Sequence, residues 1–228
     1  LARRLLADGF LVSAGARGSV PIEHENLHVA RYEATDPASA PAWVAACVQK
    51  FGRVDAVVNA AGINPVWQLL DDDETELDAM LLVNTKAPLR VVRAAWPHLV
   101  ASGHGRVVNI ASLSGKRVGG ATNAGYQMSK FALVGATHAL RKAGWAHGIR
   151  ATAVCPGYVR TDMTSYVTNF AAEAPLNVCE EHFAIFAWRA DCRHAGSRRS
   201  YLSASALSTL SVMSILKKKK TASCRMRS

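Results

Sequence analysis

A tyrosine and a lysine four positions apart are the residues of this chain best suited to chemistry. Tyr126 and Lys130 lie in a segment with a helical pattern, and residues i and i+4 share one face of a helix. A nearby ammonium favours the phenolate and lowers the pKa of a tyrosine from its usual value of about 10. Tyr126 could then pass a proton to or from a substrate hydroxyl or carbonyl. Ser112 ends a strand-like run fourteen residues earlier, and its hydroxyl could hydrogen-bond to the same oxygen.

Strand and helix patterns alternate along residues 1–163, and these elements must position the three side chains. Such alternation predicts a parallel sheet with right-handed crossovers, which is the doubly wound, Rossmann-type α/β fold. We predict a turn over 15–18, strands over 10–14, 27–32, 54–58, 106–111 and 148–154, and helices over 1–8, 38–51, 77–100 and 123–142. Pro88 and Pro97 are expected to limit or kink the third of these helices.

Two further motifs stand at the ends of predicted strands. The sequence Asn-Ala-Ala-Gly occupies 59–62, and Pro-Gly-Tyr-Val-Arg-Thr occupies 156–161. Taken alone, each would indicate only a turn after a strand. Together with Ser112 and Tyr126-x-x-x-Lys130, in this order, they resemble the short-chain dehydrogenase/reductase family over residues 1–163.

The resemblance implies a catalytic role for four side chains. Tyr126 would be the general acid/base, and Lys130 would lower its pKa and bind the nicotinamide ribose. Ser112 would orient the substrate oxygen, and Asn84 would hold a water that links Lys130 to solvent. An asparagine inside a helix is mildly unfavourable because its side chain competes with the backbone, so a functional reason for Asn84 is expected.

The resemblance also implies a cofactor site for NADP, with NAD as the alternative. Arg17 follows the second strand of the family's fold, where a cation suits a 2′-phosphate, although it could be an ordinary surface arginine in a turn. Asp36 would touch the adenine amino group or cap the following helix, and these two interpretations are compatible. The backbone of Val159 and the hydroxyl of Thr161 would bind the carboxamide. The full set of implied cofactor contacts is Arg17, Asp36, Asn59, Ala60, Gly62, Val83, Tyr126, Lys130, Pro156, Gly157, Val159 and Thr161.

Both ends of the chain depart from the pattern of the family. The chain begins inside a helix, so the first strand and the glycine-rich phosphate loop are missing, and we expect a fragment. We assign residues 1–165 to an incomplete dinucleotide-binding and catalytic domain. Residues 166–228 are expected to form an atypical, poorly ordered basic segment, which is explained by a changed reading frame, altered splicing or gene decay.

Charge and composition limit the other classes of function. The net charge of +10 lies mainly in the tail, because residues 1–165 hold 17 Lys and Arg against 13 Asp and Glu, and 166–228 hold 10 against 4. This distribution does not favour a nucleic-acid binder. No apolar run reaches the length of a membrane helix, which is about 18 residues, and no signal peptide is recognised. The five scattered cysteines are typical of reduced thiols, so a cytoplasmic location is expected.

No metal site is predicted. The tail contains Cys179, His182, Cys192 and His194, but their spacing is not a standard zinc pattern.

The helix at 123–142 bears on assembly. Ala124, Met128, Ala132, Leu133 and Ala136 fit a packing face, and the small residues Ala132, Gly135 and Ala136 would let a second copy approach. The resemblance implies a homodimer or homotetramer.

Two functions are therefore carried forward. The first is an oxidoreductase that transfers a hydride between NADP(H) and a small carbonyl or alcohol substrate. The second is a catalytically inactive fragment of such an enzyme, which retains only a binding or dimerising surface.

Overall fold

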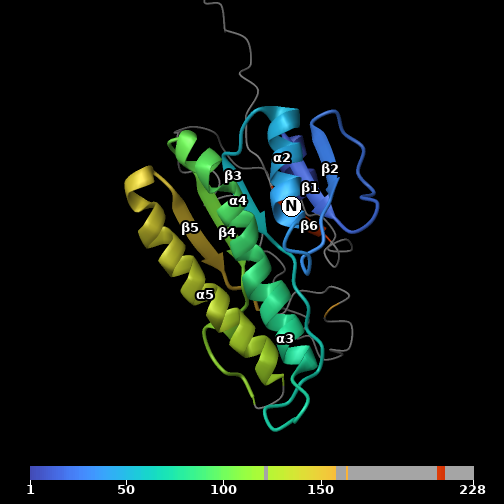
Figure 1. The fold of residues 1–228 in the computed structure, drawn as a ribbon, viewed down its shortest axis with the longest axis vertical. Helices are drawn as coiled ribbons and strands as arrows, with labels where there is room; N and C mark the ends of the chain where they lie inside the picture. Colours follow the sequence, from blue (N-terminus) through green and yellow to red (C-terminus); the bar gives the residue numbers. More distant parts are fainter. Residues whose placement is uncertain (121–122, 158–162, 164–209, 214–228) are drawn as a thin grey trace, which may run out of the picture.

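A computed structural model describes residues 1–120, 123–157, 163 and 210–213 of the chain. Strands and helices alternate over the first 157 residues, except that β2 follows β1 with no helix between them (Figure 1). The strands are β1 (Val12–Ala16), β2 (Leu27–Arg31), β3 (Ala56–Asn59), β4 (Arg106–Ile110), β5 (Arg150–Val154) and β6 (Leu210–Met213). The α-helices are α1 (Ala2–Ala7), α2 (Ser39–Phe51), α3 (Thr75–Leu81), α4 (Ala87–Ala101) and α5 (Ala124–Gly144). Short helices η1 (Leu82–Lys86), η2 (Leu113–Gly115) and η3 (Trp145–His147) join them, and η1 is a π-helix.

The strands form two groups of three, in the orders β2-β1-β6 and β3-β4-β5. Pairs β1–β2, β3–β4 and β4–β5 are parallel, as the alternating pattern predicted. β6 is antiparallel to β1 and lies beside β3, so it stands between the two groups. The four residues of β6 belong to the segment for which we predicted poor order; the other residues from 166 onward lie outside the described part of the chain. Strand pairing over such a long sequence separation leaves no local signal.

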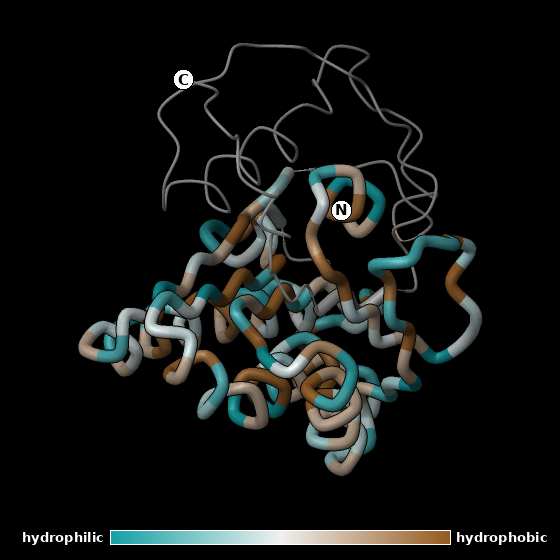
Figure 2. Tube along the Cα trace, turned by 90° about the horizontal axis from the view of Figure 1, so that it is seen from above, coloured by the Kyte–Doolittle hydropathy of each residue, from teal (hydrophilic) through white to brown (hydrophobic). Residues whose placement is uncertain are grey.

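Helices cover both faces of the sheet. Helices α2, α4 and α5 lie on one face (Figure 1), and α1 lies on the other (Figure 2). Successive side chains of a strand point to opposite faces. Val12 of β1 accordingly packs with Leu5 and Leu6 of α1, whereas the Ser13 hydroxyl accepts a hydrogen bond of 2.9 Å from the Trp43 indole of α2. All five residues of β1 are therefore buried.

The main core lies between the sheet and the helices α2 and α4. Its fully buried members include Trp43, Val57, Val91, Leu99 and Ile149. No helix in the described part of the chain is both long enough and apolar enough to cross a membrane.

The first strand begins and ends two residues later than predicted. Gly9 takes a φ of 81°, and the N–H of Phe10 bonds back to the Leu5 carbonyl, so the chain is still leaving α1 at that point. Gly15 and Ala16, predicted as part of a turn, belong to the strand because they pair with Ala30 and Arg31. Here pairing between strands overrides the local glycine signal.

The single helix predicted over 77–100 is instead three segments. α3 is followed by the π-helical turn η1, and α4 begins just before Pro88. Proline has no N–H to donate to the carbonyl four residues earlier, which here is that of Asn84. The turn before it is widened, and the N–H of Ala87 bonds to the Leu82 carbonyl five residues back. Pro97 lies inside α4 without ending it.

The packing face predicted for α5 is wrong in part. Leu133 is buried, but Met128 is 45% exposed and Ala132 is also exposed. The buried residues of α5 are Gly125, Gln127, Ser129, Lys130, Leu133, Thr137 and Gly144. Apolar spacing misplaced this face because several of its residues are polar groups held by hydrogen bonds.

Gly148 offers a test of the junction between α5 and β5. Its φ is 72°, and a β-carbon there would overlap the Gly103 carbonyl. We expect Gly148→Ala to lower the free energy of unfolding in urea by more than Gly52→Ala. Gly52 has a similar φ of 77° but open space around it. The left-handed conformation costs alanine about 1–2 kcal/mol at either position, and overlap adds about 1–3 kcal/mol at Gly148. Equal losses would contradict the described contact.

Candidate active site

Lys130 is a buried cation at the end of a central strand. Its side chain is on α5, only 4% of the residue is exposed, and its ammonium donates a hydrogen bond of 3.0 Å to the Ile110 carbonyl of β4. Burial lowers the pKa of Lys130 from 10.5 to about 8, while charge on the nearby Cys155 acts in the opposite direction. The ammonium lies 5.5 Å from the centre of the Tyr126 ring, so the two residues share one helix face as predicted.

Asn84 is fully buried in the π-helical turn η1. Its side-chain oxygen accepts a hydrogen bond of 2.8 Å from the N–H of Ile63, and its amide donates one of 2.9 Å to the Ile63 carbonyl. The same amide donates to the Ser129 hydroxyl at 2.9 Å. Asn84 therefore joins the loop after β3 to the helix that carries Tyr126 and Lys130.

The loop after β3 runs directly over this cluster. A β-carbon added to Gly62 would lie 3.3 Å from Oδ1 of Asn84 and 3.4 Å from Nζ of Lys130. Glycine leaves this approach to the two polar groups open. The backbone of residues 62 and 63, the amide of Asn84 and the Lys130 ammonium thus occupy one small volume.

Ser112 is the N-cap of the short helix η2, two residues after the end of β4. Its hydroxyl accepts a hydrogen bond of 3.1 Å from the N–H of Ser114. The N–H of Leu113 donates to the Pro156 carbonyl at 2.7 Å, which ties this turn to the loop after β5. Gly115 packs closely against α5, since a β-carbon there would lie 2.6 Å from the Lys130 carbonyl. The turn of Ser112 is therefore fixed against the backbone of Lys130.

A chain of buried amides and a hydroxyl supports the floor of the site. Asn59 of β3 donates to Asn109 of β4 at 2.7 Å, and Asn109 donates to Thr137 of α5 at 2.8 Å. Thr137 in turn donates to the Leu133 carbonyl at 2.7 Å. Asn59 therefore ties β3 to β4, and the link extends into α5.

The remaining cofactor candidates lie around the carboxyl ends of the strands or just beyond them. Val83 is buried beside Asn84, whereas Arg17 directly follows β1 and is exposed. Asp36 is exposed and accepts a hydrogen bond of 2.9 Å from the N–H of Ala38. The N-cap of α2 is Ala38, so the prediction that Asp36 caps this helix is wrong; Asp36 holds the turn two residues before the cap. Hydrogen bonds of the described residues do not join Arg17 or Asp36 to the Lys130 cluster.

The other predicted residues either have no described side-chain contact with the Lys130 cluster or lie outside the described part of the chain. Ala60 and Pro156 are partly exposed, and Gly157 is exposed. Of the residues discussed in the sequence analysis as possible cofactor contacts or metal ligands, those outside the described part of the chain are Val159, Thr161, Cys179, His182, Cys192 and His194.

Three residues of this cluster escaped prediction. Ser129 accepts from Asn84, Thr85 donates to the Ser129 carbonyl at 2.9 Å, and the Ile110 carbonyl receives the Lys130 ammonium. Ser129 precedes Lys130 within the Tyr-x-x-x-Lys motif, but a serine inside a helix gives no clear signal until its partner on another helix is known. A backbone carbonyl such as that of Ile110 carries no sequence signal.

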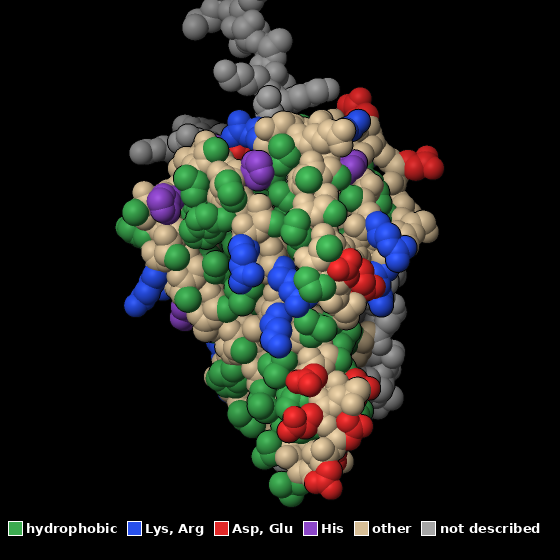
Figure 3. All heavy atoms as spheres, viewed as in Figure 1, with side chains coloured by type: hydrophobic (Ala, Val, Ile, Leu, Met, Phe, Trp, Pro, Cys, Tyr) green, Lys and Arg blue, Asp and Glu red, His purple; other side chains and the backbone are tan. Residues whose placement is uncertain are grey.

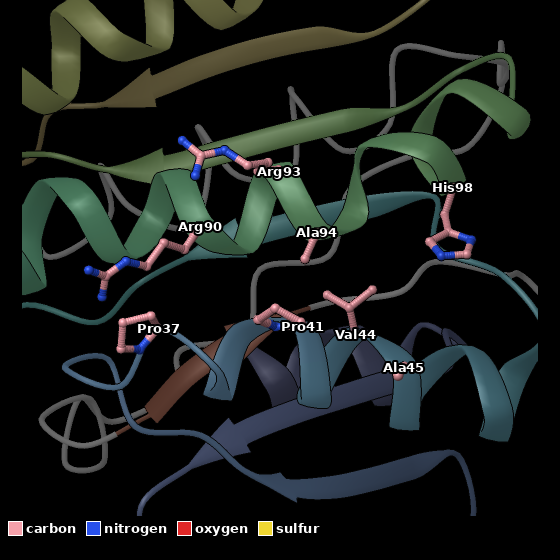
Figure 4. Close-up of a pocket in the computed structure, with 8 residues that line it drawn as sticks. All are labelled: Pro37, Pro41, Val44, Ala45, Arg90, Arg93, Ala94 and His98. Carbon is pink, nitrogen blue, oxygen red and sulfur yellow. The ribbon is translucent and has the colours of Figure 1, made fainter.

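A shallow groove of about 380 Å³ lies elsewhere, between α2 and α4. Pro41 and Val44 point into the gap between the two helices (Figure 4), and Arg90 and Arg93 also line the groove. The Arg90 guanidinium donates a hydrogen bond of 3.4 Å to the Ala34 carbonyl before α2. On the same face of the molecule, basic side chains gather over the middle and acidic ones at the narrow end where α3 lies (Figure 3). The groove does not contain the grouping of polar atoms found around Lys130.

Known proteins resemble most of this chain. A sequence model of the family described as short chain dehydrogenase matches residues 1–172. An agropine synthesis reductase of Rhizobium rhizogenes is 41% identical over 173 residues, which are 73% of this chain and 40% of that protein. A short-chain dehydrogenase of Streptomyces avermitilis superposes with a TM-score of 0.65 at 28% identity, covering 70% of this chain and 61% of that one.

A gluconate 5-dehydrogenase of Burkholderia cenocepacia, solved with NADP and tartrate, gives a TM-score of 0.60 at 26% identity. That match covers 64% of this chain and 57% of the dehydrogenase. The chain thus spans two fifths of the length of the agropine synthesis reductase and about three fifths of the two solved structures.

The buried charge of Lys130 predicts an unusual dependence of stability on pH. The unfolded chain keeps this lysine protonated up to about pH 10.5, whereas the folded protein releases the proton near pH 8. Between these values the unfolded state binds more protons, so stability rises with pH. We expect the free energy of unfolding to gain up to about 3 kcal/mol from pH 7 to pH 10.5 relative to Lys130→Met.

Urea unfolding across this pH range measures the effect. Lys142→Met is the matched control, because Lys142 is an exposed lysine in the last turn of the same helix. This variant should keep the pH slope of the wild type. A wild-type slope equal to that of Lys130→Met would show that Lys130 is solvated.

Proposed function

Because this chain belongs to the short chain dehydrogenase family, we propose that it is an oxidoreductase. It transfers a hydride between NADP(H) and a small carbonyl or alcohol substrate. The observation that supports this proposal best is the cluster of Lys130, Tyr126, Asn84 and Gly62 beside the carboxyl ends of β3 and β4. In open α/β sheets, ligands bind at that edge.

Tyr126 moves the proton in the proposed reaction. A bound nicotinamide would supply or accept the hydride at the substrate carbon. In the direction of reduction the phenol of Tyr126 gives a proton to the carbonyl oxygen, and in oxidation its phenolate takes the proton of the alcohol. The Lys130 ammonium favours the phenolate because opposite charges attract. Ser112 donates a hydrogen bond to the same oxygen and holds it in place.

Asn84 supports the return of the proton. Both donors of its amide and one acceptor position of its oxygen are engaged with Ile63 and Ser129. An amide oxygen has a second acceptor position. We assign that position to a water beside Lys130, which would connect the ammonium with solvent.

The proposed cofactor is NADP, with NAD as the alternative. Arg17 stands after β1, where its guanidinium would pair with a 2′-phosphate. The solved dehydrogenase of Burkholderia cenocepacia that this chain resembles was crystallised with NADP. The other proposed contacts are Asp36, Asn59, Ala60, Gly62, Val83, Tyr126, Lys130, Pro156, Gly157, Val159 and Thr161.

A homodimer or homotetramer is proposed through α5. Met128 and Phe131 are 45% and 42% exposed on this helix, and Ala132 and Gly135 beside them are small and exposed. Exposed apolar groups next to small ones allow two helices to approach closely.

The second candidate function is a catalytically inactive module that keeps a binding or dimerising surface.

Cofactor binding and turnover separate the two candidates. NADPH fluorescence is titrated against the full chain, and its oxidation by a panel of small aldehydes and ketones is followed. We expect saturable NADPH binding. Arg17→Ala should weaken it about tenfold, since a hydrogen bond between charged groups contributes about 1.5–3 kcal/mol, and should leave NADH binding unchanged. Arg141→Ala is the matched control, because it removes an exposed arginine in the last turn of α5.

Tyr126→Phe should bind NADPH normally and turn over at least about 100-fold more slowly, because it lacks the transferable proton. Absence of NADPH binding at millimolar concentrations would favour the inactive module. Binding without turnover by any carbonyl compound would contradict the catalytic proposal alone.

A further inference from the structure

Ser129 is a fully buried hydroxyl placed between the two residues of the proton-transfer pair. It lies on α5, three positions after Tyr126 and one before Lys130. Its hydroxyl donates a hydrogen bond of 2.8 Å to the Tyr126 carbonyl and accepts one of 2.9 Å from the Asn84 amide. A hydroxyl has one proton and two acceptor positions. Donation to Tyr126 therefore fixes the side on which Asn84 can approach.

The π-helical turn holds Ser129 twice. Besides the Asn84 bond, the Thr85 hydroxyl donates to the Ser129 carbonyl at 2.9 Å. Asn84 and Thr85 are consecutive, and in an α-helix such residues point about 100° apart around the axis. Here both reach one residue of the neighbouring helix. Single π-helical turns are frequent at functional sites.

We propose that Ser129 is a positioning residue that sets where Tyr126 and Lys130 stand relative to Asn84 and the loop after β3. Its side chain is fully buried against the Tyr126 carbonyl and the Asn84 amide, so its effect on the reaction is indirect. It acts through the Tyr126 carbonyl, which it holds, and through Asn84, whose amide orients the backbone of Ile63. The inference rests on the proposed oxidoreductase function for its catalytic consequence, but the geometric consequence is independent of turnover.

Loss of the hydroxyl has a defined effect on each partner. In Ser129→Ala the Asn84 amide keeps its bond to Ile63 but loses its partner on α5, inside a buried region. A buried donor left without a partner is costly, so Asn84 would turn or a water would enter. Either response changes the surroundings of the Lys130 ammonium, because Oδ1 of Asn84 and Nζ of Lys130 both lie beside Gly62.

Ser13 provides a matched control for a purely structural hydroxyl. It is also fully buried, and its hydroxyl is bonded to the Trp43 indole at 2.9 Å and to the His28 ring at 3.0 Å. Ser13→Ala makes the same chemical change in the packing of β1 against α2, away from the Lys130 cluster. Both variants should lose stability to urea, so stability alone does not distinguish the two roles.

The test compares wild type, Ser129→Ala, Thr85→Val and Ser13→Ala as full chains. NADPH-dependent reduction of a panel of aldehydes and ketones is measured from pH 6 to pH 10. We expect Ser129→Ala to reduce kcat at least about tenfold, because a small misplacement of a reacting group can cost about a hundredfold. Its pH profile should shift, and its KM for NADPH should stay within about twofold. Thr85→Val should show a smaller loss of the same kind, and Ser13→Ala should match the wild type.

A second readout needs no turnover. With tyrosines labelled at the ring carbon that bears the hydroxyl, the NMR signal of Tyr126 is assigned by its loss in Tyr126→Phe and titrated with pH. Ser129→Ala should move the titration midpoint by about 0.5 pH unit or more, and Ser13→Ala should not. If Ser129→Ala does not fold, Thr85→Val decides, because it removes only the bond to the Ser129 carbonyl.

The outcomes are distinct. The Tyr126 titration could shift in Ser129→Ala while neither the wild type nor any variant reduces a carbonyl compound. That result would support the positioning role and contradict the oxidoreductase proposal. The inference would be overturned if Ser129→Ala had the kcat, pH profile and Tyr126 titration of the wild type. If Ser129→Ala is unfolded, the same result in Thr85→Val would overturn it. Ser129 would then be a structural hydroxyl.

Discussion

The rest of the site depends on keeping one positive charge inside the protein. An ammonium removed from water is costly unless its hydrogen bonds and charge are compensated. Lys130 is compensated by the Ile110 carbonyl at the end of β4 and by the face of the Tyr126 ring, and its pKa nevertheless falls to about 8. A cation with this pKa can respond to the charge of a neighbouring phenol in the physiological range.

The elements around Lys130 are arranged to make that burial possible. The π-helical turn brings Asn84 and Thr85 to α5, and the loop after β3 brings the backbone of Gly62 within reach of the ammonium. The turn of Ser112 packs against the Lys130 backbone through Gly115. These contacts join the π-helical turn and the segments that follow β3 and β4 to Ser129 and Lys130 of α5. They fix this part of α5, and acid–base chemistry needs such fixed geometry.

The sequence predicted the parts of this arrangement that depend on local spacing. The i, i+4 spacing placed Tyr126 and Lys130 together, the alternation of strands and helices predicted the parallel pairs, and the cost of an asparagine inside a helix drew attention to Asn84. The π-helical turn was not foreseen, because Pro88, which follows it closely, was interpreted only as a limit or kink. Ser129 was overlooked because a helical serine has meaning only through its partner on another helix. β6 was overlooked because its partner, β1, is about 200 residues away in sequence.

The titration of the Lys130 ammonium tests the central claim most directly. Lysines labelled with ¹⁵N and ¹³C would be followed by NMR from pH 6 to pH 11, with Lys130 assigned by its loss in Lys130→Met. A buried ammonium that organises the site should titrate near pH 8 and well apart from the exposed lysines. A Lys130 signal that titrates with them, near pH 10.5, would contradict the account.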